Sequence, residues 1–169
     1  PIVAQKVLRL GADSAAKRRL VELLKERHGG SLERLNAAWG TAFESFDALQ
    51  GTPVEVSAEQ AGKASADFSA FLTLLAETYY GTIRDAIRKH DPNHLYLGSR
   101  FAQAPNEAVA AAGKYCDLVS FNVYKPELDK DRFDALYVLA RRPFLIGEFS
   151  AGARDRGMLG VAFVVGDSQ

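Results

Sequence analysis

The 169-residue chain is poor in cysteine, in net charge and in long apolar runs. Cys116 is the only cysteine, which excludes an intrachain disulfide and a zinc site built from a cysteine cluster. The 21 basic and 21 acidic residues give a formal net charge of zero, so the charge does not favour nucleic acid or an anionic membrane as a partner. The apolar runs are too short to span a bilayer. We therefore expect neither a nucleic-acid nor a membrane partner.

Motifs that bind cofactors are also missing. Neither the G-x-G-x-x-G turn of dinucleotide-binding sheets nor a P-loop occurs in the sequence. His28, His90 and His94 lack the spacing of metal ligands, and we predict that all three face solvent. No cofactor or metal is therefore expected. Because the chain begins at Pro1 and a predicted strand lies near its end, we expect both ends to be cuts through a longer polypeptide.

The first half of the chain is predicted to be helical. Apolar residues recur there at three- and four-residue steps, and the strongest such pattern lies in a long segment that begins with a Ser-x-x-Gln capping box. The predicted elements are, in order, a helix over 2–10, a helix capped by Asp13 or Ser14 and ended by Gly29 and Gly30, a helix over 31–39, a loop over 40–56 and one long helix over 57–90.

The second half alternates between short apolar strands and helices. The predicted strands are 95–99, 118–123, 144–149 and 161–165, and the predicted helices are 106–114 and 131–141. Apolar strands separated by helices indicate a parallel sheet covered on both faces. Such units form an open sheet or a barrel, and the missing phosphate-binding turn disfavours an open nucleotide-binding sheet. We therefore expect an α/β fold, about the last four units of a (β/α)₈ barrel, in a single domain over residues 1–169.

Polar side chains stand where the predicted strands end: Arg100, Asn122 with Tyr124, and Glu148. In a barrel these ends share the face that carries the active site. Glu148 is the most informative of them, because its neighbours are apolar or small and an ionised carboxylate there is costly unless it is paired or hydrated. Glu148 is either catalytic or a structural partner of an arginine, and its place at a strand end favours catalysis.

The residues around Glu148 have alternative interpretations. Asn122 and Tyr124 point to the same side of a strand, where the Tyr124 hydroxyl can donate to Glu148 and Asn122 can bind a substrate hydroxyl. The alternative is a buried tyrosine beside an asparagine that caps a turn. Arg100 either lies beside Glu148, binds substrate or forms a structural ion pair. Asp155 follows on the next loop, where it either lines the site or forms a turn.

Two other residues are expected to be structural. Trp39, with Phe43 nearby, is placed to stack on a sugar ring, but we expect it to pack the short helix against the long one. No histidine is near Cys116 in sequence, so we expect a small buried hydrophobe rather than a nucleophile.

Three segments resemble β-agarases of glycoside hydrolase family 50, which are distant relatives of the family 42 β-galactosidases. They are AIRKHDPNHLYLGSRF with the following AAGKYCDLVSFNVY, PFLIGEFSAGARDRGM, and LERLNAAWGTAFESFDAL. The resemblance implies a retaining hydrolase of β-galactosidic linkages in a saccharide such as agarose, with Glu148 as nucleophile. It assigns Arg100, Asn122 and Tyr124 as polar groups that either contact the sugar or support the site, and it implies a secreted or periplasmic protein.

The chain departs from this family pattern in two places. Ser150 and Ala151 stand where the agarases tend to carry bulkier residues, so the family's subsite contacts are not carried over to these positions. The acid/base glutamate of these families belongs to an Asn-Glu pair that ends a strand, whereas Asn106-Glu107 here opens a helix. We therefore expect the acid/base to lie before Pro1 and the isolated chain to be nearly inactive and to self-associate through unpaired strand edges. The alternative is a noncatalytic carbohydrate-binding or scaffold remnant of such a barrel.

Overall fold

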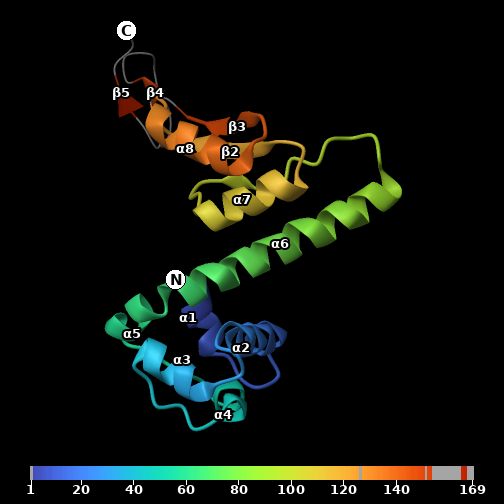
Figure 1. The fold of residues 1–169 in the computed structure, drawn as a ribbon. Helices are drawn as coiled ribbons and strands as arrows, with labels where there is room; N and C mark the ends of the chain where they lie inside the picture. Colours follow the sequence, from blue (N-terminus) through green and yellow to red (C-terminus); the bar gives the residue numbers. More distant parts are fainter. Residues whose placement is uncertain (1, 126, 151, 154–164, 167–169) are drawn as a thin grey trace. The chain divides into compact units, whose positions relative to one another are not determined.

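The computed structural model describes residues 2–125, 127–150, 152–153 and 165–166. The chain divides into two compact units, Pro1–Leu75 and Ala76–Gln169, and helix α6 contributes to both. The first unit is helical, and the second contains a parallel sheet with helices (Figure 1). The predicted α/β class is therefore confirmed. No helix among these residues is long and apolar enough to cross a membrane.

The first unit contains five helices and the start of a sixth. They are α1 (Ile2–Leu8), α2 (Ala15–Arg27), α3 (Leu32–Trp39), α4 (Phe46–Gly51), α5 (Ala58–Lys63) and α6 (Ser65–His90). Four of these helices have a serine at the N-cap, whose hydroxyl accepts a hydrogen bond from a backbone N–H in the first turn. The four are Ser14, Ser31, Ser45 and Ser57. Ser57 and Gln60 complete the predicted capping box.

A buried carboxylate joins three helices of this unit. Asp67 on α6 accepts hydrogen bonds from Arg27 Nε at 2.5 Å and Trp39 Nε1 at 2.7 Å, and it shares one with His28 Nε2 at 2.9 Å. The predicted packing of Trp39 is confirmed, because the fully buried indole lies edge-on to Phe68 of α6. The prediction that His28 faces solvent is wrong, since the bond to Asp67 draws the ring inward. His90 and His94 are exposed, as predicted.

Two helix predictions in this unit are also wrong. Residues 40–56 contain α4, which buries Leu49 and is held by Lys17, a fully buried lysine that donates to the carbonyl of Thr52 at 2.5 Å. The long helix is interrupted at Ala64, a fully buried residue between α5 and α6. Both departures depend on tertiary burial, of Leu49 and the Lys17 amine in one case and of Ala64 in the other, which the local sequence pattern does not contain.

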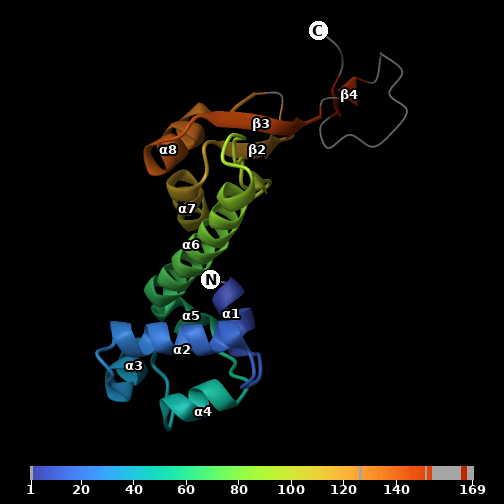
Figure 2. The ribbon, with the colours of Figure 1, turned by 90° about the vertical axis from the view of Figure 1, so that its right-hand side faces the viewer.

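The second unit is built on three parallel strands. β1 (Arg100–Phe101), β2 (Val119–Val123) and β3 (Phe144–Phe149) lie in this order in the sheet, with α7 (Asn106–Tyr115) and α8 (Lys130–Ala140) between them in the chain. Figure 2 shows β2 and β3 side by side, with α7 and α8 near them. β4 (Gly152–Ala153) and β5 (Val165–Gly166) form a separate parallel pair. Residues 161–164 of the predicted fourth strand lie outside the described residues.

Helices and sheet meet over an apolar layer in this unit. Phe121 at the centre of β2 contacts the rings of Phe101, Phe133 and Phe144, with centroids 4.8–5.8 Å apart. α7 and α8 touch at Gly113, where a Cβ atom would lie 2.3 Å from the Ala140 carbonyl oxygen. The predicted burial of Cys116 is confirmed, since the residue is 2% exposed and burial raises the pKa of its thiol to about 11.

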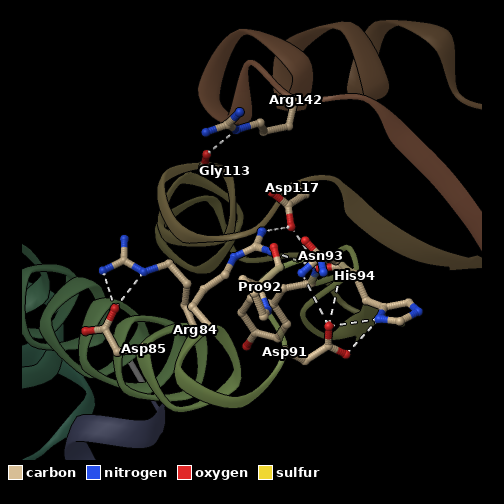
Figure 3. A network of polar contacts seen from close by, with 11 residues as sticks. Arg84, Asp85, Asp91, Pro92, Asn93, His94, Gly113, Asp117 and Arg142 are labelled. Carbon is tan, nitrogen blue, oxygen red and sulfur yellow. Dashed lines mark hydrogen bonds and ion pairs between the residues drawn. The ribbon is translucent and has the colours of Figure 1, made fainter.

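The first strand begins later than predicted, at Arg100 instead of residue 95. Gly98 has a φ of +65°, and the N–H of Tyr96 donates to the Asp117 carboxylate at 2.7 Å, so this backbone cannot join a regular ladder. Arg88 also donates to Asp117, at 2.6 Å, and to the carbonyls of Pro92 and His94. Figure 3 shows Asp117 close to Pro92 and His94. This network fixes the path from α6 into β1.

Candidate active site

Side chains from β1 and β2 meet at Glu148, which lies near the carboxyl end of β3; Arg100, predicted to end its strand, instead begins β1. Arg100 Nη1 at the start of β1 lies 2.8 Å from Glu148 Oε2, and Asn122 Nδ2 on β2 donates to the same oxygen at 3.2 Å. The hydroxyl of Tyr124, just after β2, donates to Glu148 Oε1. The Glu148 side chain is 37% exposed, so solvent reaches it. Three donors from two neighbouring strands therefore hold one accessible carboxylate.

A bulge in β3 turns Glu148 toward these donors. Ile146 packs with the apolar layer on the helix-covered face, and regular alternation would place Glu148 on that face too. The register shifts between the strands, however: Ile146 pairs with Phe121, but Asn122, the next residue of β2, pairs with Glu148. Gly147 is thus an extra residue. A bulge of this kind re-aims the side chain that follows it.

The hydrogen bond between Tyr124 and Glu148 affects the phenol. It is the main cause of a raised pKa for Tyr124, with burial second. The phenol therefore stays protonated near neutral pH and keeps donating to Glu148. Asn122 Nδ2 also lies 3.4 Å from the Tyr124 hydroxyl, whereas its Oδ1 is buried without a hydrogen-bond partner among the described residues. Exchanging the two amide atoms would set an oxygen against the carboxylate, so the Nδ2 assignment is electrostatically favoured.

Most of the residues singled out in the sequence come together here. Arg100, Asn122 and Tyr124 all contact Glu148, and their roles in binding or catalysis stay predictions. Asp155 lies outside the described residues. Ser120 was not singled out, although period two places it on the same side of β2 as Asn122, and it is 2% exposed. Among the residues with described side chains, no group of three or more His, Cys, Asp or Glu is placed to hold a metal ion.

A cavity of about 370 Å³ lies beside this site, at the ends of β1 and β2. Aromatic rings and polar groups of the strand ends, the loops and α8 line it. Phe101, Phe121, Asn122, Tyr124, Asp129, Arg132 and Phe133 are among its lining residues. Tyr124 therefore borders both the cavity and the Glu148 carboxylate.

The sequence matches the model of the glycoside hydrolase family 42 β-galactosidases over residues 12–154. The chain belongs to this family. Among curated relatives of this family 42 chain, β-agarase A of Vibrio sp. (strain JT0107) is 36% identical and β-agarase B of the same strain is 30% identical. Each alignment covers 92% of the chain and 16% of the relative. The chain thus spans about 16% of the length of these agarases.

Solved structures resemble the chain over nearly all of its residues. An agarase, AgWH50C, has a TM-score of 0.87 at 33% identity and covers 98% of this chain, which corresponds to 23% of the agarase. An exo-β-agarase has a TM-score of 0.83 at 31% identity, over 98% of this chain and 22% of its own. PfGH50B has a TM-score of 0.86 at 31% identity, over 96% of this chain and 23% of its own length. The predicted resemblance to agarases and to family 42 enzymes is therefore confirmed.

Proposed function

We propose that these residues supply the nucleophile of a retaining glycoside hydrolase that cleaves β-galactosidic linkages in agarose or related saccharides. The observation that carries the proposal is the convergence of Arg100, Asn122 and Tyr124 on Glu148, near the carboxyl ends of the parallel strands β2 and β3. Membership of a glycoside hydrolase family and similarity to two β-agarases support the reaction class and the substrate.

Glu148 is the nucleophile of the reaction in this proposal. Its ionised carboxylate attacks the anomeric carbon and forms a covalent glycosyl-enzyme, while a second carboxylic acid protonates the departing oxygen. That second group then takes a proton from water, which attacks the anomeric carbon and releases Glu148. The hydrogen bonds from Tyr124 and Arg100 fix the direction of the carboxylate, and Asn122 contacts a sugar hydroxyl.

The acid/base belongs outside residues 1–169 in this account. We propose that both compact units form one domain, part of a (β/α)₈ barrel in which β1, β2 and β3 are neighbouring strands. General acid–base catalysis typically contributes about 10²–10⁴-fold, so the chain by itself is expected to be nearly inactive. The similarity to only 16% of the length of the agarases supports assigning the activity to a longer polypeptide.

Glu148→Ala in the complete polypeptide that carries these residues tests the proposal. We expect kcat on agaro-oligosaccharides to fall by on the order of 10⁴-fold, since the covalent intermediate can no longer form. Azide should restore turnover by taking the place of the carboxylate, and the azide product should have the inverted anomeric configuration. Glu33→Ala is the matched control, because this exposed glutamate lies on α3 in the first compact unit.

An active Glu148→Ala variant would contradict the proposal, as would release of the inverted anomer from the natural substrate. A wild-type polypeptide that binds agaro-oligosaccharides without cleaving them would instead favour the noncatalytic remnant.

A further inference from the structure

We infer that Gly147 and Ser120 form a matched pair that positions Arg100 against the nucleophile, an inference that rests on the proposed role of Glu148. Gly147 is the extra residue of the β3 bulge, and Ser120 faces it from β2. Neither residue touches the Glu148 carboxylate in a hydrogen bond or ion pair. They act through the aliphatic part of the Arg100 side chain, and are thus positioning residues.

Backbone conformation does not require glycine at position 147. The glycines with positive φ are Gly29, Gly30, Gly40 and Gly98 among the residues that the structure describes, and Gly147 is not one of them. An L-residue therefore fits the backbone there. Something other than chain conformation must explain the missing side chain.

The space around Gly147 supplies the reason. A Cβ atom at this position would lie 2.4 Å from Ser120 Oγ, 3.1 Å from Arg100 Cδ and 3.5 Å from Arg100 Cγ. By contrast, a Cβ atom on Gly51 or Gly62 would meet nothing within 4 Å. The serine hydroxyl and the aliphatic part of the arginine side chain therefore occupy the space that a side chain at position 147 would need.

The arginine depends on this contact for its position. Its side chain is 57% exposed, so packing confines it only weakly elsewhere. The stem lies across Gly147, and the guanidinium reaches Glu148 Oε2 at 2.8 Å. Ser120 is 2% exposed and pairs in register with Arg100. Its small side chain leaves room for the aliphatic part of Arg100 to lie close to Gly147. A larger side chain at either position would lift the guanidinium away from the carboxylate.

Gly147→Ala in the complete polypeptide tests this inference, with Gly62→Ala as the control that has free space. We expect kcat to fall about 10–100-fold, because small displacements of catalytic groups are costly, while KM stays within about 3-fold. Ser120→Ala removes the hydroxyl that the new methyl group would strike. The double variant Ser120→Ala/Gly147→Ala should therefore recover much of the lost kcat.

Arg100→Met shows whether the effect runs through the arginine. If it does, Arg100→Met/Gly147→Ala should turn over no more slowly than Arg100→Met alone, since the two changes share one cause. Additive losses would overturn the inference. So would a Gly147→Ala enzyme with wild-type kcat, or a double variant with Ser120→Ala that is no faster than Gly147→Ala.

Folding and function are separated in the same series. Thermal melts of every variant identify loss of fold. If Gly147→Ala does not fold, a folded and active Ser120→Ala/Gly147→Ala variant supports the pairing. An unfolded double variant overturns it. Glu148→Ala with azide rescue reports on the proposed nucleophile independently. An inactive, azide-rescued Glu148→Ala beside a fully active Gly147→Ala would refute the pairing alone.

Discussion

At the scale of single residues, Glu148 is held by donors of different kinds. Arg100 supplies a charged donor at 2.8 Å, Asn122 supplies an amide, and Tyr124 supplies a phenol whose pKa is raised by the bond it makes. Charge-assisted hydrogen bonds to a carboxylate are stronger than neutral ones. Arg100 and Tyr124 bind different oxygens of Glu148, so together they fix the plane of the carboxylate.

Tyr124→Phe removes the donor to Oε1 and keeps the ring. We expect kcat to fall about 10–100-fold in the complete polypeptide, because a preorganised donor at a reacting group is lost. Steady-state rates on agaro-oligosaccharides measure the effect, with Tyr137→Phe on the exposed side of α8 as the control. Equal rates for Tyr124→Phe and wild type would show that the phenol does not support the nucleophile.

The sequence indicated these contacts only in part. The sequence placed Arg100, Asn122, Tyr124 and Glu148 where predicted strands end. Because the carboxyl ends of parallel strands share one edge, this placement predicted that the first three lie near Glu148. The bulge was not predictable, because strict alternation from Ile146 places Glu148 on the helix-covered face. Gly147 marks the bulge, and its tight contacts become visible only when Ser120 of β2 and the side chain of Arg100 from β1 are in place.

At the scale of elements, capping and local burial decide where helices and strands begin. The serine hydroxyls made the helix starts predictable, since each cap needs only a few neighbouring residues. α4 was missed because it is six residues long and buries only Leu49. β1 was misplaced because Asp117, distant in sequence, takes the N–H of Tyr96.

Asp67 connects three helices, and its protonation should loosen the first unit. Burial by itself raises the pKa of Asp67, but hydrogen bonds from Arg27, Trp39 and His28 outweigh burial and hold the pKa below its usual value. A carboxyl whose pKa is lower in the folded chain stabilises the fold above the unfolded pKa, near about 3.9, and this stability is lost as pH falls through the folded pKa. We therefore expect the first unit to lose stability below about pH 4.

Asp67→Asn should remove most of this acid dependence and lower the free energy of unfolding at pH 7 by about 1–3 kcal/mol. Fluorescence of Trp39, the only tryptophan, follows urea unfolding of the first unit at several pH values. Asp13→Asn, at an exposed position, is the control. An acid dependence that survives unchanged in Asp67→Asn would assign it to other groups.

At the scale of the whole molecule, the three-stranded sheet has two outer strands. Among the residues whose structure is described, β1 and β3 each pair with one neighbour in this sheet, so each presents an edge of backbone groups there. Unpaired edges favour association with other strands. In the proposed barrel, strands from elsewhere in the longer polypeptide cover these edges.

We therefore expect purified residues 1–169 to self-associate. Sedimentation velocity should show an average mass that rises with concentration, and the melting temperature should rise with concentration as well. The complete polypeptide, measured at the same concentrations, is the comparison. A monomer with a sharp, concentration-independent melt would show that these edges are covered within the chain.

The most direct measurement for the nucleophile is covalent trapping on the complete polypeptide with a 2-deoxy-2-fluoro-β-galactosyl fluoride. Mass spectrometry after proteolysis should find the fluoro-sugar on the peptide that contains Glu148, with inactivation in proportion to labelling. Fragmentation should place the ester on Glu148 itself. A label on another carboxylate, with Glu148 unmodified, would contradict the account.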